Sequence, residues 1–400
     1  MKAKNLIKIN LVLITLVATV PLFGQEWSEP ILISVGDTPD IDIDPITGNM
    51  YILSMKNGVT LTKVNPDGII LEKETVPGAE SDKGGGHFGA SVAIDSKGYP
   101  HVCYRYHEGK DDDDTPMYTV FYVKKTDQGW QNRIMLSENV RRGYVVRIDV
   151  DENDVAHIAH GFIYDNVWGH IRYFRIIDNA IDKQQVLGLD YPYIYRGDDR
   201  LEITTAPGGK IYIVSGVPNP NGLVYYLVSK NGGEDFSNFG DIHGSECNNQ
   251  SRNGSPDIAV DLIGNVHICY GFSEDLTRNE EPSVRYTRFE NDNQVIDLAA
   301  TPYGYLSGWE KAGMGLGSIA CSYNGQVLVI AFLEQPSGPL YATTSEDYGA
   351  TWEQPVEIVF ASGSDEGRNK QFVRSRGNKF YLVYPHNYNV YLRILTVQVN

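Results

Sequence analysis

The sequence predicts an all-β fold, a seven-bladed β-propeller, and three observations lead to this prediction. One unit, two short strands of alternating apolar residues joined by a tight turn, recurs along the whole chain. The seven copies span residues 38–55, 84–107, 145–162, 200–217, 255–272, 316–332 and 371–386. Equivalent positions in successive copies are 50 to 61 residues apart, and no helical signal interrupts them. A repeated all-β unit of about 50 residues is typical of propellers, in which each copy forms one four-stranded blade.

The second copy shows how the unit is built. Alternating apolar residues over 90–94 predict a first strand, residues 95–98 a turn, and residues 100–106 a returning strand. The turn ends in glycine, which accepts the positive φ that such a turn needs. His87 and His107 lie just outside the two strands, so the hairpin should place both at the same rim of the propeller.

Each copy continues into a third strand. These strands are predicted at residues 59–64, 118–124, 170–176, 224–229, 284–289, 340–344 and 390–397. The last blade lacks a fourth strand because the chain stops, and the segment 26–34 can supply it and close the ring. One position in the second strand carries an anchor residue: Tyr51, His101, His157, Tyr212, His267, Leu328 and Tyr381. We expect its three histidines to be packed between blades.

An Asp-box pattern, Ser-x-Asp-x-Gly-x-x-Trp, occurs in the sixth copy as Ser345, Asp347, Gly349 and Trp352. Residues 229–236 form a looser version in the fourth copy. Aspartate side chains accept hydrogen bonds from nearby backbone N–H groups and so stabilise turns. We therefore interpret the motif as structural, with the aspartate capping a turn and the tryptophan packing between blades.

The first 24 residues are typical of a signal peptide, and residues 25–400 are predicted to form the catalytic propeller domain. Three early lysines precede an apolar run, residues 11–23, that is too short to span a bilayer. We expect a secreted, extracellular or periplasmic, monomeric protein without membrane attachment. Without those lysines, 31 basic residues face 51 acidic ones, a net charge of −20 that argues against nucleic-acid binding. The four cysteines are expected to be buried free thiols, although an exported compartment permits disulfides.

Basic and aromatic residues collect at the predicted rim. Residues there that are candidates for substrate binding are Arg142, Tyr144, Arg172, Arg196, Arg252 and Asn253. In an acidic protein, such a local positive funnel attracts an anionic ligand. Arginine pairs with planar carboxylates and sulfates through two hydrogen bonds, and aromatic rings offer flat faces to sugars. An anionic polysaccharide is therefore the predicted partner.

The rim histidines indicate cleavage of a uronic acid by β-elimination. This reaction needs a group that neutralises the carboxylate, a base for the C5 proton and an acid for O4. His87 and His107 can serve as base or acid because imidazole titrates near neutral pH. Arg200 is the candidate for neutralising the carboxylate, and Tyr164 is a further candidate acid.

A metal site is a separate hypothesis. His243 and Cys247 lie in one loop and could contribute to a structural zinc site if a distant histidine joined them. The elimination chemistry itself requires no metal or other cofactor.

The seven repeats, the Asp-box remnants, the spacing of 20 residues between His87 and His107, and Arg200 93 residues further on resemble the propeller ulvan lyases, polysaccharide lyase families 24 and 25. That family cleaves a sulfated algal polysaccharide of rhamnose 3-sulfate and uronic acids by β-elimination. The resemblance implies paired catalytic roles for the two histidines, carboxylate neutralisation by Arg200 and the family's catalytic tyrosine at Tyr164. It also implies a structural metal ion, zinc or calcium.

Two alternatives remain open. Asp-boxes also occur in sialidases, but those have six blades and an early Arg-Ile-Pro motif, which this sequence lacks. A non-catalytic propeller that binds acidic glycans would keep the basic and aromatic rim but would not need the histidine pair.

Overall fold

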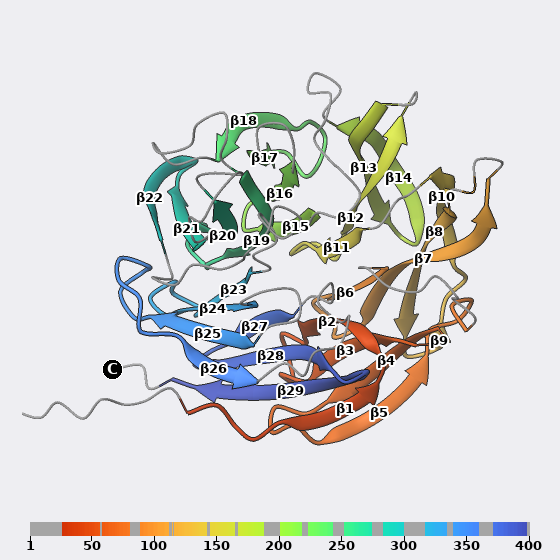
Figure 1. Cartoon of the computed structure of the whole chain (residues 1–400). Coiled ribbons are helices and arrows are strands. Elements are labelled where there is room, and N and C mark those ends of the chain that lie inside the picture. Colours follow the sequence, from red (N-terminus) through yellow and green to blue (C-terminus); the bar gives the residue numbers. More distant parts are fainter. Residues whose placement is uncertain are drawn as a thin grey trace, which may run out of the picture.

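The computed structural model describes residues 26–56, 58–80, 89–111, 114, 116–141, 145–164, 167–187, 201–217, 223–242, 252–273, 283–299, 317–333, 339–359 and 371–397, in places at strand ends by their backbone only. These residues form seven antiparallel sheets arranged in a ring (Figure 1). The structure is therefore the predicted all-β, seven-bladed propeller. Within the described ranges, no helix is long and apolar enough to cross a membrane.

The first two blades follow directly along the chain. Blade 1 consists of β2 (Asp37–Ile43), β3 (Met50–Met55), β4 (Val59–Val64) and β5 (Ile70–Thr75). Blade 2 consists of β6 (Ala90–Ile94), β7 (Pro100–Lys110), β8 (Pro116–Thr126) and β10 (Ile134–Arg141), and the short β9 (Gly129–Trp130) also pairs with β8.

Blades 3 to 5 repeat this order. Blade 3 consists of β11 (Val146–Val150), β12 (Ala156–Tyr164), β13 (Val167–Ile177) and β14 (Ala180–Leu187). Blade 4 consists of β15 (Leu201–Ala206), β16 (Lys210–Val217), β17 (Leu223–Ser229) and β18 (Ser237–Ile242). Blade 5 consists of β19 (Arg252–Val260), β20 (Val266–Ser273), β21 (Ser283–Glu290) and β22 (Asn293–Ala299).

The last two blades complete the ring. Blade 6 consists of β23 (Gly317–Cys321), β24 (Leu328–Leu333), β25 (Leu340–Ser345) and β26 (Val356–Val359). Blade 7 consists of β27 (Phe372–Arg376), β28 (Lys379–His386), β29 (Asn389–Thr396) and β1 (Ile31–Val35). Strand β1 pairs antiparallel with β29, which confirms that the N-terminal segment closes the ring. All seven predicted third strands are confirmed as β4, β8, β13, β17, β21, β25 and β29.

Apolar side chains from facing sheets form the core between adjacent blades. Between blades 2 and 3, for example, Cys103 and Tyr122 pack in one cluster with Ile148 and Phe174. Cys103, Cys269 and Cys321 are buried free thiols, as predicted, and Cys247 lies outside the described residues. Burial of such surface stabilises the fold by roughly 25 cal/mol per Å² of apolar area.

The innermost strands also join neighbouring blades through hydrogen bonds. Carboxylate oxygens of one blade accept backbone N–H groups of the next. Asp40 Oδ2 accepts from Val92 at 3.0 Å, and Asp149 Oδ2 accepts from Thr205 at 2.6 Å. These bonds satisfy buried backbone donors and fix the rotation of each blade relative to the next.

The two rims of the propeller are built differently. At the turn rim, where the first and second strands of each blade meet, tight turns such as residues 95–99 and 151–155 connect them. At the loop rim, where the first strands begin, the fourth strand of one blade precedes the first strand of the next, as β14 precedes β15.

The anchor histidines lie near the turn rim and are fully buried, as predicted. Each places Nδ1 against a tyrosine hydroxyl of the third strand and Nε2 near the turn aspartate. The Nδ1–hydroxyl distances are 2.8 Å for His101 and Tyr122, 2.7 Å for His157 and Tyr173, and 2.8 Å for His267 and Tyr286. The histidines therefore join strand to turn within one blade.

The Asp-box of blade 6 has the predicted structural role. Gly349 N donates to Ser345 Oγ at 2.9 Å, and Thr351 N donates to Asp347 Oδ1 at 2.8 Å. Trp352 then packs edge-on against Tyr286 of blade 5, with ring centroids 5.2 Å apart.

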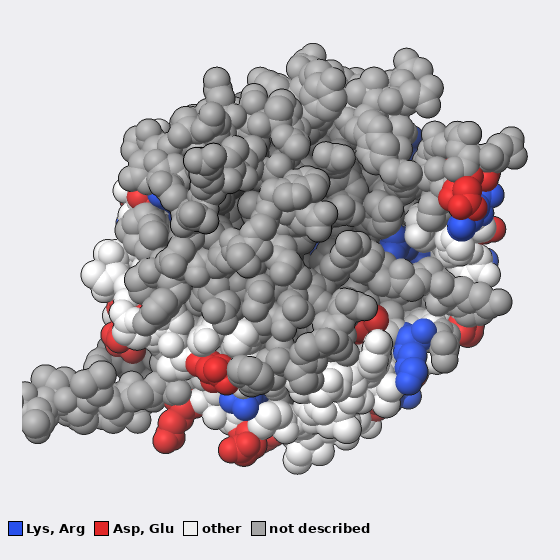
Figure 2. Space-filling view, viewed as in Figure 1, with Lys and Arg blue, Asp and Glu red and all other residues white. Residues whose placement is uncertain are grey.

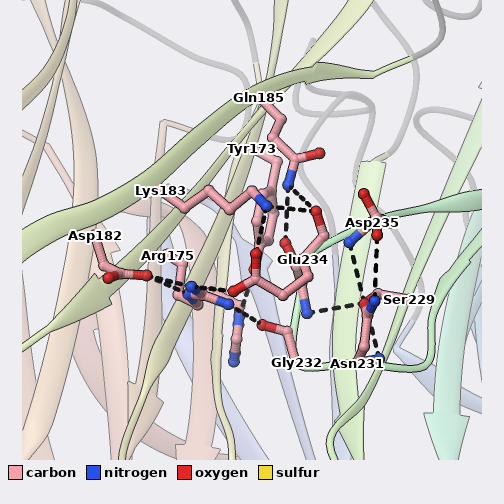
Figure 3. Close-up of polar contacts among 12 residues, drawn as sticks. Tyr173, Arg175, Asp182, Lys183, Gln185, Ser229, Asn231, Gly232, Glu234 and Asp235 are labelled. Atoms are coloured by element: carbon pink, nitrogen blue, oxygen red, sulfur yellow. Dashed lines mark hydrogen bonds and ion pairs between the residues drawn. The ribbon is translucent and has the colours of Figure 1, made fainter.

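The looser copy in blade 4 repeats this geometry. Gly233 N donates to Ser229 Oγ at 2.9 Å, and Phe236 packs against Tyr173 of blade 3 with ring centroids 4.8 Å apart. Polar side chains of blade 3 surround this turn (Figure 3): Arg175 donates to the Gly232 carbonyl at 2.8 Å, and Lys183 pairs with Glu234 at 2.6 Å.

Candidate functional site

Most of the residues predicted for the site lie outside the described part of the chain. These are His87, Arg142, Tyr144, Arg196, Arg200, His243 and Cys247. For Tyr164, Arg252 and Asn253 the structure gives the backbone, which belongs to β12 and β19 at the loop rim. For His107 and Arg172 the structure also gives the side chains and their contacts.

His107 lies at the loop-rim end of β7. Cys103 on the same strand faces blade 3. Because side chains alternate along a strand, Arg105 and His107 face blade 3 as well. His107 is half-buried, and its ring lies 5.3 Å from that of Tyr118 on β8. The buried Arg105 guanidinium lies 4.4 Å from the centre of the same tyrosine ring.

A second set of polar side chains meets at this interface, with one residue from blade 2 and two from blade 3. Ser137 Oγ of β10 lies 2.8 Å from His160 Nε2 of β12, and Arg172 Nη1 of β13 donates to Ser137 Oγ at 3.1 Å. His160 Nδ1 lies 3.1 Å from the Gly161 carbonyl, which can only accept. The histidine therefore carries its proton on Nδ1, and Nε2 accepts from the serine hydroxyl.

Burial determines the charge of these groups. It lowers the pKa of His160 to about 4, an effect that the nearby Arg172 reinforces and the Gly161 carbonyl opposes, so this imidazole is neutral near pH 7. Burial also lowers the pKa of Arg172. A neutral, hydrogen-bonded His160 holds Ser137 and Arg172 in place and is not suited to donate a proton to substrate.

We call Arg105, His107, Tyr118, Ser137, His160 and Arg172 the loop-rim cluster. It brings two arginines, two histidines, a tyrosine and a serine to one interface between blades 2 and 3. The sequence analysis singled out His107 and Arg172 but missed the other four. Their positions inside regular strands resemble ordinary core positions. One signal was available: charged and imidazole side chains stand at strand positions that face the neighbouring blade, where apolar residues are expected.

The central channel below the rim has a different charge. A cavity of about 200 Å³ there is lined by Asp40, Asp42, Asp149, Glu202, Arg147 and Arg374, among others. Arg147 Nε pairs with Glu202 at 3.0 Å. Burial and the nearby Asp149 carboxylate raise the pKa of Asp42 to about 7. The described channel wall is thus richer in carboxylates than in cations. The few charged side chains that are coloured in Figure 2 lie near the edges of the face and include both signs.

His243 and Cys247, the predicted metal ligands, lie outside the described residues. Among the residues that are described, no group of three or more histidine, cysteine, aspartate and glutamate side chains could hold a metal ion.

Comparisons with known proteins identify the fold. No protein-family model matches the chain, and no curated protein matches its sequence. A polysaccharide lyase of family 25, an ulvan lyase, matches with a TM-score of 0.55 at 10% identity, over 92% of this chain and 95% of that one. The BP39L lectin from Burkholderia pseudomallei matches with a TM-score of 0.62 at 9% identity, over 92% and 98%. An α-L-arabinanase from Penicillium chrysogenum matches with a TM-score of 0.51 at 9% identity, over 93% and 98%. The chain shares its propeller fold with these proteins.

Proposed function

We propose that this protein is an exported polysaccharide lyase that cleaves a sulfated, uronic-acid-containing polysaccharide such as ulvan by β-elimination. The observation that carries the proposal is the loop-rim cluster, in which the half-buried His107 packs against Tyr118, Arg105 lies over the same tyrosine ring, and Arg172 is held by Ser137 at the same interface. One structural neighbour, the ulvan lyase, has been solved with a bound chain of glucuronic acid and rhamnose 3-sulfate.

The proposed reaction uses three kinds of group. An arginine, for which Arg200 is the candidate, neutralises the substrate carboxylate and thereby acidifies the proton on C5. A base removes that proton, the C4–O4 bond breaks, and a double bond forms between C4 and C5. An acid protonates the departing O4. His107 is assigned one of the two proton transfers and His87 or Tyr164 the other, since histidine and tyrosine side chains both serve as general acids or bases.

The described residues support distinct roles within this scheme. His107 is half-buried, which leaves part of its ring accessible to a sugar at the rim. Arg105 lies over the Tyr118 ring and holds it against His107. His160 and Ser137 fix the position of Arg172 at the interface between blades 2 and 3.

The direct test incubates the mature chain with ulvan and records absorbance near ~235 nm, where the unsaturated product of an elimination absorbs. A rise in absorbance that matches the appearance of new reducing ends supports the lyase. New reducing ends without absorbance would indicate a hydrolase of the sialidase type. Binding of ulvan without either change would indicate a non-catalytic glycan-binding propeller.

A further inference from the structure

At the turn rim, aromatic side chains close the gaps between most of the neighbouring blades that can be compared. Phe236 of blade 4 covers Tyr173 of blade 3, and Trp352 of blade 6 covers Tyr286 of blade 5. In both cases an Asp-box turn delivers the aromatic ring. Between blades 4 and 5 the same space is filled from a strand, because Phe289 stacks on Tyr226 with ring centroids 4.9 Å apart.

Among the described residues, no such aromatic ring lies at the turn rim between blades 2 and 3. Blade 2 has the same buried tyrosine, Tyr122, hydrogen-bonded to its anchor histidine. Blade 3, however, joins its last two strands by the two-residue turn Asp178–Asn179 in place of an Asp-box. At the strand position where blade 5 has Phe289, blade 3 has the smaller Ile176. A cavity of about 460 Å³ results, and it lies within the range of roughly 300–1,000 Å³ found for ligand pockets.

The walls of this cavity carry polar groups with unused hydrogen-bonding capacity. Asn179 Oδ1 is buried and has no hydrogen-bond partner. Among the described residues, the side chains of Gln131, Asn153 and Asp178 also have no hydrogen-bond or ion-pair partner, and all three line the cavity. Buried polar groups are normally paired, so an unpaired amide oxygen in a cavity points to a ligand or water that pairs with it.

The charges of the cavity disfavour an anion. Its two lysines are already neutralised: Lys97 pairs with Asp154 at 3.0 Å, and Lys124 pairs with Asp95 at 2.7 Å. Asp178 adds a carboxylate without a cationic partner in the described part of the chain. These charges disfavour a negatively charged ligand, and the amide and carboxylate groups of the wall can exchange hydrogen bonds with hydroxyl groups.

We infer that this turn-rim cavity binds one neutral monosaccharide unit of a glycan. A pyranose ring takes the space that an aromatic ring takes at the other interfaces. Its hydroxyl groups pair with Gln131, Asn153, Asp178 and Asn179. The site lies on the opposite rim from the loop-rim cluster and does not depend on the lyase activity, so a lyase with this site would hold a glycan at a second point.

The experiment measures binding of glucose, galactose, mannose, rhamnose and xylose to the full chain by saturation-transfer NMR, with glucuronate as the anionic comparison. The double variant Gln131→Ala/Asn153→Ala removes two amides from exposed positions, and Asn153→Trp fills the cavity. Asn293→Ala is the control, because this turn-rim amide contacts only its own turn in blade 5. Methyl resonances of Ile176 and Ile177, which line the cavity, report on the site in the unaltered protein.

At least one neutral sugar should bind and shift both methyl resonances. The double variant should weaken that binding by about 4- to 100-fold, since each of the two lost hydrogen bonds weakens binding about two- to tenfold. Asn153→Trp should abolish binding, and Asn293→Ala and His107→Ala should leave it unchanged. Absence of binding by every neutral sugar, unmoved methyl resonances, or tighter binding of glucuronate would each overturn the inference. If His107→Ala alone abolished binding, the sugar would lie at the loop rim and the turn-rim site would be refuted.

Discussion

The two rims of this propeller use the same residue types for opposite purposes. At the turn rim, His157 is fully buried between Asp151 and Tyr173, and equivalent histidines occur in two other blades. At the loop rim, His107 is half-buried and has an aromatic neighbour but no carboxylate partner among the described residues. The contrast teaches that the partners of a histidine, more than its presence, separate structural from functional positions.

The largest expected effect is the loss of turnover when the loop-rim histidine is removed. His107→Ala should lower turnover of ulvan by about 10²- to 10⁴-fold, because a general acid or base contributes that much. His386→Ala is a matched control, since His386 ends the second strand of blade 7 and also lies near a third-strand tyrosine, Tyr391. Steady-state kinetics at 235 nm would measure both variants. Equal losses would remove His107 from the reaction.

A second prediction concerns the arginines outside the described residues. Arg200→Ala should lower turnover by about 10²- to 10³-fold, because the lost charge stabilises the transition state. Arg142→Ala should raise KM with a much smaller change in kcat. Similar small effects for both arginines would exclude Arg200 as the group that neutralises the reacting carboxylate.

Removal of a turn-rim histidine should lower the stability of the fold but leave kcat unchanged. His157→Ala leaves a cavity and removes the hydrogen-bond partner of the Tyr173 hydroxyl. We expect a loss of about 2–4 kcal/mol in the free energy of unfolding. Denaturant titration measures that loss, and kcat per folded molecule should be unchanged. Unaltered stability would contradict the assignment of the anchor histidines as structural.

The central channel between the rims gives the smallest predicted effect. The pKa of Asp42 is raised to about 7, so the folded chain binds a proton there that the unfolded chain releases near pH 4. Ionisation of Asp42 therefore costs stability progressively as pH rises from about 4 to 7. Asp42→Asn should stabilise the protein by about 1–3 kcal/mol at pH 8 and by little at pH 4, because one pKa unit corresponds to about 1.4 kcal/mol and the side chain is only partly buried. Thermal unfolding across this pH range would detect it, and a pH-independent difference would refute the assignment.

The number of blades, the strands and the way the ring closes can all be predicted from the amino-acid sequence. These features depend on alternation and on a repeat, which are properties of residues close together in the chain. The structural roles of the anchor histidines and of the Asp-box follow for the same reason, because each motif recurs in more than one blade and its hydrogen bonds join residues close together in the chain.

The side-chain contacts between blades could not be predicted in this way. Ser137 and His160 belong to different blades and gave no local signal, although they lie 2.8 Å apart. The turn-rim cavity likewise arises because blade 3 supplies no aromatic ring to cover a tyrosine of blade 2. Such contacts depend on the rotation and register of one sheet against the next, and the periodicity of a single strand carries no information about either.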